Sequence, residues 1–485
     1  MILPQFSPNS WIDRRKFLGH RHIFMNLANC IAIVLAAGQG TRMKSSRPKV
    51  LHQVAHRSML SHVLAAANGA GVTRHVVVLG PDMDDVKADV SVAAASQDCD
   101  TDFAIQQKRL GTGDAVKAAR DSVADHSGPA IILLGDTPLL RSETVSDMAS
   151  NLGEADIVVL GFRPDDPAGY GRMLLDEAGL LQAIVEHKDA SAEERQTDLC
   201  FSGLMAFSAV AHLKLLDQLT TDNAQGEYYL TDIVALAKKA GLRVAKAECD
   251  EADVMGVNSR ADLARAETVM QDRLRQRAMD GGVTMQDPKS VYLAYDTEIA
   301  ADVALEPNVV FGPGVKISSG ATIRGFSHLE SATIGKGAQI GPYARLRPGA
   351  QIGEGAKVGN FVEIKKSEIG VRAKVNHLSY IGDATIGANA NIGAGTITCN
   401  YDGFNKWQTV IGEGAFIGSN SALVAPVTID DGVIVGSGSV VTNDVEKDAL
   451  VVARGRQEVK AGWATRFRER AAKIKQAKQK ARATG

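Results

Sequence analysis

Hydrophobic residues follow two different patterns along the chain. Between positions 30 and 258, short apolar runs at 31–35, 75–79, 130–134 and 157–160 alternate with helical stretches such as 59–70 and 112–123. This alternation is typical of a mostly parallel sheet with helices on both faces. Ligands of such sheets bind beyond the carboxyl ends of the strands. We therefore expect the loops after Leu35, Leu79 and Leu134 to carry function.

In the second half an aliphatic or aromatic residue returns at every sixth position, often followed by glycine. The repeated positions are Phe311, Ile317, Ile323, Leu329, Ile334, Ile340, Leu346, Ile352, Val358, Ile364, Ile369, Val375, Ile381, Ile386, Ile392, Ile411, Ile417, Leu423, Ile429, Val435 and Val441. Such a hexapeptide repeat predicts a parallel β-helix, because each repeat forms one flat face and three faces close a coil of about 18 residues. A polar and aromatic interruption at 394–406 predicts a loop that serves a site.

These patterns predict a sequence of five segments. They are an N-terminal extension (1–24), an α/β domain (25–258), a helical linker (259–281), a β-helix (282–455) and a basic tail (456–485). Residues 13–19 resemble a twin-arginine export signal, but no apolar run follows them. We interpret the extension as disordered, with Met25 as an alternative start, and we expect no export. No segment reaches the roughly 18 apolar residues that a membrane span needs.

Charge and cysteine content narrow the classes of function. The formal net charge of −2 over 485 residues gives no reason to expect nucleic-acid binding or membrane insertion. The tail is the exception, with a net charge of +8 from ten Lys/Arg and two Glu; it is either a solubilising end or a contact for phosphates. The five cysteines, Cys30, Cys99, Cys200, Cys249 and Cys399, are far apart. They favour a reducing cytoplasm over a disulfide framework or a zinc site.

The segment directly after the first apolar run carries the first chemical motif. Residues 35–43 read Leu-Ala-Ala-Gly-Gln-Gly-Thr-Arg-Met, and Pro-Lys-Val-Leu follows at 48–51. Glycines in such a loop let backbone N–H groups approach a polyphosphate. Arg42 and Lys49 supply the positive charge that a nucleoside triphosphate needs. The motif is neither a Walker A loop nor GxGxxG.

This string resembles the signature of the sugar nucleotidyltransferases, which join a sugar 1-phosphate to a nucleoside triphosphate. Further segments resemble that family in its own order, at 106–113, 134–139, 169–172, 184–190, 226–232 and 256–258. With the hexapeptide half, residues from about 28 to 463 resemble a bacterial family of bifunctional uridyltransferases and acetyltransferases. The resemblance implies an α/β Rossmann-like nucleotidyltransferase domain joined by a helix to a left-handed parallel β-helix.

The resemblance also implies the reactions. Glucosamine 1-phosphate is acetylated from acetyl-CoA, and UTP then gives UDP-N-acetylglucosamine, a precursor of peptidoglycan and lipopolysaccharide, with release of pyrophosphate. Asp136 and Asn258 are expected to hold Mg²⁺, while Lys49 and Arg42 balance phosphate charge. The residues expected to bind UTP or the UDP-sugar are Leu35, Ala36, Ala37, Gly38, Lys49, Gln106, Gly111, Thr112, Leu134, Gly135, Asp136, Gly171, Glu186 and Asn258.

In the repeat half, the segment Asn-His-Leu-Ser-Tyr at 376–380 resembles the catalytic segment of the acetyltransferase. His377 is expected to act as the base and Glu363 to orient its ring. The residues expected to hold glucosamine 1-phosphate are Arg347, Lys365, Tyr380 and Asn391. Those expected to bind acetyl-CoA are Ala394, Asn400, Tyr401, Ser419, Ser437 and Arg454. In the family this groove lies between neighbouring β-helices, so a homotrimer is implied.

One departure from the family affects the sugar site. Phe201 stands where the family has an asparagine that hydrogen-bonds the sugar. A lost polar contact of this kind costs about 1–3 kcal/mol. Two other hypotheses remain: a nucleotidyltransferase for another sugar whose β-helix is only a scaffold, and a non-catalytic subunit like those of translation exchange factors. The presence of Lys49, Asp136 and Asn258 argues against the second of these.

Overall fold

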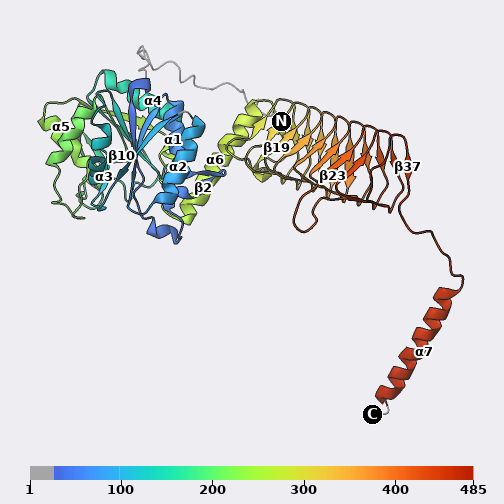
Figure 1. The fold of residues 1–485 in the computed structure, drawn as a ribbon. Helices are drawn as coiled ribbons and strands as arrows, with labels where there is room; N and C mark the ends of the chain where they lie inside the picture. The colour runs from blue at the N-terminus through green and yellow to red at the C-terminus, as the bar shows by residue number, and fades with distance from the viewer. Residues whose placement is uncertain (1–26, 98, 484–485) are drawn as a thin grey trace, which may run out of the picture. The chain divides into compact units, whose positions relative to one another are not determined.

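The computed structural model describes residues 27–97 and 99–483, which form two compact units (Figure 1). The first unit contains the described residues up to 277 together with 293–295. The second contains 278–292 and the residues from 296 onward. The helix α6 (Arg260–Asp280) lies where the linker was predicted, and most of its residues belong to the first unit. The predicted extension at 1–24 lies outside the described residues.

The first unit is built on one sheet whose main strand order is β11-β7-β10-β6-β1-β4-β5, with β8 and β9 beside β10. Its strands are β1 (Ile31–Leu35), β4 (Arg74–Leu79), β5 (Asp100–Ile105), β6 (Ala130–Leu134), β7 (Ile157–Phe162), β8 (Arg172–Leu175), β9 (Leu181–Val185), β10 (Cys200–Phe207) and β11 (Val244–Cys249); a separate pair is formed by β2 (Gln53–Val54) and β3 (Arg57–Ser58). On the main path only β10 runs antiparallel to its neighbours. Leu35 is in register with both Val78 and Leu134. The carboxyl ends of the three central strands therefore lie together, as predicted.

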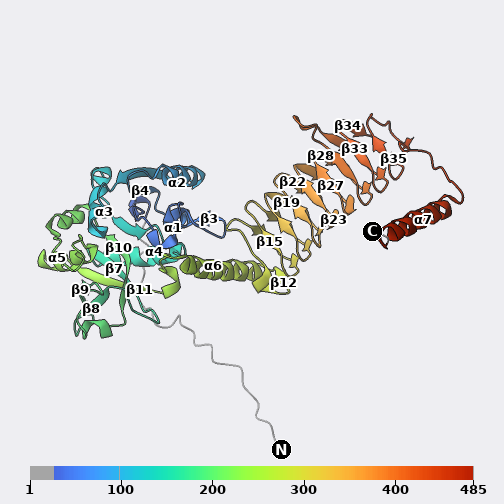
Figure 2. The same ribbon diagram turned by 90° about the horizontal axis from the view of Figure 1, so that it is seen from below.

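Helices cover both faces of this sheet because its buried strands are apolar on both sides (Figure 2). Along β1, Ala32 and Val34 enter one core, and Ile31 and Ile33 enter the other, as the two-residue period of a strand requires. The helices α1 (Met59–Gly69), α2 (Asp84–Gln97) and α4 (Ser142–Ser150) pack on the first core, and α3 (Thr112–Ala118) and α5 (Ile233–Lys239) on the second.

The second unit is a left-handed parallel β-helix whose short strands form three sheets. The first sheet contains β12 (Thr284–Met285), β14 (Ala304–Leu305), β17 (Thr322–Ile323), β20 (Gln339–Ile340), β23 (Lys357–Asn360), β26 (Lys374–His377), β29 (Asn391–Ile392), β32 (Phe416–Ile417), β35 (Ile434–Val435) and β37 (Leu450–Val451). The second contains β13 (Glu298–Ile299), β16 (Lys316–Ile317), β19 (Ala332–Ile334), β22 (Ala350–Ile352), β25 (Ser367–Ile369), β28 (Ala384–Ile386), β31 (Thr409–Ile411) and β34 (Val427–Ile429). The third contains β15 (Val310–Phe311), β18 (His328–Leu329), β21 (Arg345–Leu346), β24 (Glu363–Lys365), β27 (Tyr380–Gly382), β30 (Ile397–Cys399), β33 (Ala422–Val424) and β36 (Val440–Val441).

The hexapeptide prediction is confirmed position by position, because every repeated aliphatic or aromatic residue predicted to point inward is buried. Each strand pairs in parallel with the equivalent strand of the next coil, so that Ile364 lies beside Ile381. The predicted interruption at 394–406 is a loop only in its later part, because Ile397–Cys399 form β30 within the coil. The chain leaves the coil between β30 and β31, where Figure 1 shows a loop projecting from the β-helix. At its tip the side chain of Phe404 is 93% exposed.

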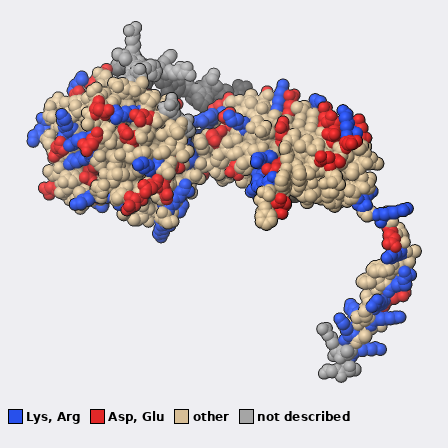
Figure 3. All heavy atoms as spheres, in the orientation of Figure 1, with Lys and Arg blue, Asp and Glu red and all other residues tan. Residues whose placement is uncertain are grey.

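The basic tail folds in part as the helix α7 (Trp463–Ala483). Figure 3 shows its Lys and Arg side chains crowded along the helix. Trp463 and Phe467 stack on each other at 5.2 Å between ring centroids, and both are about half exposed. Within residues 27–97 and 99–483, no helix is both long and apolar enough to cross a membrane.

Candidate functional sites

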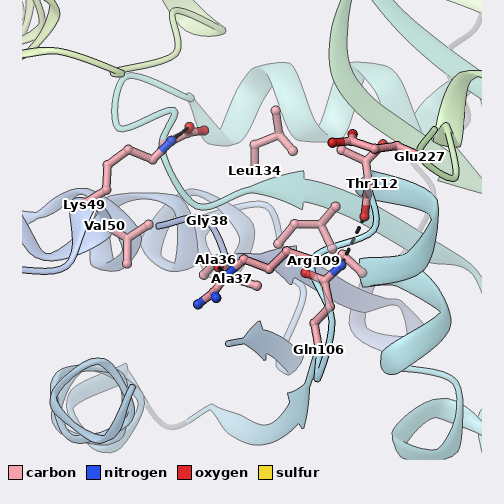
Figure 4. Close-up of a pocket in the computed structure, with 14 residues that line it drawn as sticks. Ala36, Ala37, Gly38, Lys49, Val50, Gln106, Arg109, Thr112, Leu134 and Glu227 are labelled. Atoms are coloured by element: carbon pink, nitrogen blue, oxygen red, sulfur yellow. Dashed lines mark hydrogen bonds and ion pairs between the residues drawn. The ribbon is translucent and has the colours of Figure 1, made fainter. Parts of the chain in front are cut away.

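The first site is a cavity of about 350 Å³ at the carboxyl ends of β1 and β6 (Figure 4). It is lined by Leu35, Ala36, Ala37, Gly38, Lys49, Val50, Gln106, Arg109, Gly111, Thr112, Ala115, Leu134, Asp136 and Glu227. Ten of these fourteen residues are ones that the sequence predicted for UTP binding. A cavity at this edge of a parallel sheet is where the fold places a nucleotide.

The loop after β1 requires glycine at position 40. Gly40 has φ of 62°, and a Cβ there would overlap the Cβ of Lys49. The loop therefore packs directly against the short 3₁₀ turn η4 (Lys49–Leu51), which follows Pro48. Because Gly40 lies against the base of its side chain, Lys49 extends into the cavity from a fixed starting point.

Lys49 joins two oxygen atoms on the far side of the cavity. Its ammonium donates hydrogen bonds to Oδ2 of Asp136 and, at 3.2 Å, to Oδ1 of Asn258. Figure 4 shows the lysine side chain reaching across to a carboxylate. The side chains of Lys49 and Asp136 are only 12% and 19% exposed. A carboxylate and an amide oxygen thus converge on one position that accepts a cation.

The opposite end of the cavity is held by contacts around the loop before α3. Gln106 Nε2 donates to Gly111 O at 3.1 Å and to Asp114 Oδ2 at 2.8 Å. Arg109 Nε donates to Ala37 O at 2.7 Å, which ties this loop to the glycine loop after β1. At Gly111 a Cβ would lie 2.6 Å from Tyr228 O, so only glycine fits.

Two more predicted sugar-binding residues meet beside this cavity. A Cβ added at Gly171 would lie 3.7 Å from the carboxyl carbon of Glu186. Thr231 Oγ1 donates to Glu186 Oε1 at 3.4 Å. Burial raises the pKa of Glu186. Phe201 lies in the same neighbourhood, because its backbone N–H donates to Gly171 O at 2.9 Å.

The second site follows one corner of the β-helix. Its residues, here called the corner column, are Asn360, His377, Ala394, Ser419, Ser437 and Arg454, one on each successive coil. The coils are linked along this corner by hydrogen bonds from Leu378 N to Asn360 O (3.1 Å), Gly395 N to His377 O (3.2 Å), Asn420 N to Ala394 O (2.7 Å), Gly438 N to Ser419 O (2.8 Å) and Arg454 Nη1 to Ser437 O (2.7 Å). The predicted base and four of the predicted acetyl-CoA residues therefore form one continuous line.

The ring of His377 is oriented by Asn360 on the preceding coil. His377 Nδ1 lies 2.7 Å from Asn360 Oδ1. Because an amide oxygen accepts hydrogen bonds, Nδ1 carries the proton and Nε2 keeps its lone pair. Glu363 was predicted for this orienting contact, but it accepts a hydrogen bond from Arg347 Nη1 at 2.8 Å instead. Asn360 was overlooked, although its separation of 17 residues from His377 is one coil.

Polar residues gather on the third sheet next to this corner. A Cβ at Gly382 would lie 2.5 Å from the hydroxyl of Tyr380 and 2.8 Å from Nδ2 of Asn400, so glycine lets these two side chains meet. Asn400 is buried and donates to Asp383 Oδ2 at 2.5 Å. Nearby, the pKa of Lys365 is lowered by the neighbouring ammonium group of Lys406. Two adjacent cations favour an anionic ligand.

Comparison with known proteins agrees with this architecture. Residues 32–198 match the model of the MobA-like NTP transferase domain, and residues 331–366 and 408–443 match that of the bacterial transferase hexapeptide. The bifunctional protein GlmU of Parvibaculum lavamentivorans is 61% identical over 438 residues, which is 90% of this chain and 96% of that protein. The GlmU protein of Maricaulis maris is 59% identical over 437 residues, which is 90% of this chain and 95% of that protein. That of Paramagnetospirillum magneticum is 51% identical over 439 residues, which is 90% of this chain and 96% of that protein. The chain belongs to the GlmU family.

Membership of the GlmU family confirms the predicted resemblance, fold class and class of enzyme, a bifunctional transferase. The structure places most predicted site residues in the two sites, with exceptions. Arg42 is exposed and does not line the cavity. Gly135, Gly171, Glu186 and Asn258 also lie outside its lining, although Asn258 reaches Lys49. Val50, Arg109, Ala115 and Glu227 line the cavity without having been predicted; Arg109 and Glu227 belong to segments that carried the resemblance, which was the available signal.

Proposed function

We propose that the protein makes UDP-N-acetylglucosamine in two steps, acetyl transfer at the β-helix corner and uridylyl transfer in the α/β cavity. One observation carries the proposal. The same chain holds a cavity where Lys49, Asp136 and Asn258 meet and a corner column centred on His377. Each supplies groups that one of the two reactions needs. The product of the first reaction, N-acetylglucosamine 1-phosphate, is the substrate of the second.

Uridylyl transfer needs charge balance and alignment rather than a covalent intermediate. A phosphate oxygen of N-acetylglucosamine 1-phosphate attacks the α-phosphorus of UTP. A new P–O bond forms, and the bond to pyrophosphate breaks. Lys49, which lines the cavity, stabilises the negative charge that develops on the α-phosphate. Gln106, Gly111 and Thr112 surround the base, and Glu186 and Gly171 receive the sugar.

The residues present fit a magnesium ion. Asp136 and Asn258 direct two oxygen atoms to a single position, and Mg²⁺ prefers oxygen ligands completed by water and substrate phosphates. Among the described residues no group of three His, Cys, Asp or Glu side chains is arranged to hold a metal, which agrees with a site that the substrate completes. When bound, the ion supplies charge neutralisation to the phosphates.

Acetyl transfer begins with the lone pair on Nε2 of His377. Nε2 removes a proton from the ammonium group of glucosamine 1-phosphate, and the amine nitrogen attacks the thioester carbon of acetyl-CoA. An amide bond forms, the C–S bond breaks, and the thiolate of CoA takes up a proton. Lys365, Arg347, Tyr380 and Asn391 hold the sugar phosphate. The groove for acetyl-CoA is formed by Asn400, Tyr401 and four residues of the corner column, namely Ala394, Ser419, Ser437 and Arg454.

A homotrimer completes the acetyl site. The exposed side chains of Phe326, Tyr343, Phe361 and Leu378, here called the apolar ladder, lie on four successive coils, and Phe361 directly follows Asn360 of the corner column. The three aromatic rings stack at centroid distances of 5.0 and 5.2 Å. All four side chains are between 46% and 63% exposed. Leu378 follows His377 directly. A continuous apolar edge of this kind is stabilised when a second β-helix covers it.

A cytoplasmic location is consistent with the cysteines, none of which forms a disulfide in the described residues.

The proposal is tested by incubating the full-length protein with glucosamine 1-phosphate, acetyl-CoA, UTP and Mg²⁺. Free thiol and pyrophosphate are followed separately. We expect thiol release to precede pyrophosphate release. Pyrophosphate formed only from pre-acetylated sugar would reduce the β-helix to a scaffold, and the absence of both signals would overturn the proposal.

A further inference from the structure

In the cavity of the α/β unit, a positive charge lies at the position proposed for the metal. The ammonium group of Lys49 bonds both Asp136 Oδ2 and Asn258 Oδ1. These are the two oxygen atoms that the proposed uridylyl transfer assigns to Mg²⁺. One ammonium thus occupies both ligands at once, so a metal ion and Lys49 compete for the same atoms.

The two oxygen atoms are held together by bonds that do not involve Lys49. Val257 N donates to Asp136 O at 2.9 Å, which fixes the segment before Asn258 to the loop after β6. Asp262 Oδ2 accepts from Asn258 N at 3.1 Å. Removal of the ammonium therefore leaves Asp136 and Asn258 side by side. The pair is a ready cation site, and Lys49 is its removable occupant.

Charge explains what removes that occupant. Asp136 and Lys49 neutralise each other in a poorly exposed position, so adding a divalent cation alone places two uncompensated positive charges in the cavity. A nucleoside triphosphate brings up to four negative charges. Its phosphates attract the ammonium of Lys49, and the carboxylate of Asp136 becomes available to the metal.

We propose that Lys49 acts as a placeholder for the metal, which blocks the Asp136–Asn258 site until a nucleoside triphosphate draws the ammonium away. The divalent cation then enters with the nucleotide and not before it. Lys49 has two successive partners, the metal ligands in the empty cavity and the α-phosphate in the loaded one. This inference rests on the proposed uridylyl transfer and adds an order of binding to it.

The test measures metal binding directly, without turnover. The full-length protein is titrated with Mn²⁺ in the absence of nucleotide, and free Mn²⁺ is followed by electron paramagnetic resonance. Three variants are compared with the wild type. Lys49→Met removes the ammonium but keeps an unbranched side chain that is only one atom shorter. Lys49→Met combined with Asp136→Asn removes the carboxylate ligand as well. Lys44→Met removes an exposed positive charge from the same loop.

We expect Lys49→Met to bind Mn²⁺ at least tenfold more tightly than the wild type, and the double variant to lose this gain. Lys44→Met should behave as the wild type, which separates displacement of the ammonium from a general change in charge. Equal Mn²⁺ affinity of Lys49→Met and the wild type would overturn the inference, as would a gain that survives Asp136→Asn. Circular dichroism verifies that each variant is folded.

A second measurement separates this inference from the proposed function. UTP is added to the wild type with Mn²⁺ but without sugar phosphate, and water-proton relaxation reports the ternary complex. We expect UTP to recruit Mn²⁺ to the wild type. UTP should also abolish most of the difference in Mn²⁺ affinity between the wild type and Lys49→Met. If UTP recruits no Mn²⁺ and no pyrophosphate appears with the sugar phosphate, the proposed function fails. If recruitment occurs but the nucleotide-free affinities are equal, only the placeholder role fails.

Discussion

The imidazole of His377 and the amide of Asn360 face each other across one step of the β-helix, with Nδ1 2.7 Å from Oδ1. This contact fixes which ring nitrogen is free to accept a proton. We expect Asn360→Ala to lower kcat of acetyl transfer by roughly tenfold, the effect of one lost hydrogen bond of about 1–3 kcal/mol. Uridylyl transfer should not change. Thiol and pyrophosphate assays on the same preparation measure both, and an unchanged thiol rate would contradict the assignment.

Removing the ring itself should have a larger effect. We expect His377→Ala to reduce acetyl transfer by about 10²- to 10⁴-fold, the usual contribution of a general base. Asp136→Ala should do the reverse and abolish uridylyl transfer while thiol release continues. The two variants are matched controls for each other, since each leaves the other site intact. Loss of both activities in either variant would contradict the two-site assignment.

The phenylalanine at position 201 lies beside Gly171, in a segment predicted to bind the sugar, and has no polar atom in its side chain. We expect Phe201→Asn to lower KM for N-acetylglucosamine 1-phosphate by up to about tenfold, because an amide restores a hydrogen bond worth about 1 kcal/mol. The KM for UTP should stay the same. Initial rates of pyrophosphate release at varied sugar phosphate measure the effect. A higher KM would indicate that the phenyl ring itself packs on the sugar.

Burial of Glu186 raises the pKa of its carboxyl group, which predicts a pH dependence of stability. Below the pKa of the unfolded chain the group is protonated in both states and costs nothing. As pH rises through the raised pKa, ionisation favours the unfolded state, so the carboxylate destabilises the fold at neutral pH. Glu186→Gln should therefore increase the free energy of unfolding at pH 7, by about 1 kcal/mol or less for a partly buried group.

This gain should disappear below about pH 4.5, where the side chains of wild type and variant are both neutral. Urea unfolding at pH 7 and at pH 4 measures the difference. The same variant should raise KM for the sugar phosphate, because a carboxylate binds sugar hydroxyl groups more strongly than an amide does. A stability gain that is equal at both pH values would contradict the electrostatic explanation.

The apolar ladder predicts how assembly affects each activity. We expect Phe361→Lys to dissociate the proposed trimer, because it places a charge at the end of the stacked rings, where Phe361 packs on Tyr343. Acetyl transfer should fall with dissociation, whereas uridylyl transfer should persist. Phe361→Tyr keeps the ring and serves as the control. Sedimentation equilibrium gives the assembly state, and a trimeric Phe361→Lys with full acetyl transfer would contradict the proposed interface.

Sequence alone predicted what depends on local spacing. The burial of Ile364 and Ile381 follows from a six-residue period, and the convergence of Leu35 and Leu134 follows from parallel strands. Contacts between side chains that are far apart in the sequence were not predicted. The bond from Arg109 to Ala37 depends on how two loops cross above the sheet. Which side chain hydrogen-bonds Glu363 depends on how the side chains of neighbouring coils are oriented. The spacing of the sequence alone did not distinguish Arg347 from His377 as that partner.

The regular spacing of the corner column sets the length of the groove proposed for acetyl-CoA. Successive coils of a β-structure are about 4.8 Å apart, so the column from Asn360 to Arg454, with five steps between its six residues, is about 24 Å long. The length of the groove is therefore a whole number of coil spacings. Insertion or deletion of one whole coil would lengthen or shorten the groove by one spacing while the sheets remain in register. The length of the proposed groove can thus change without any change to His377, the proposed base.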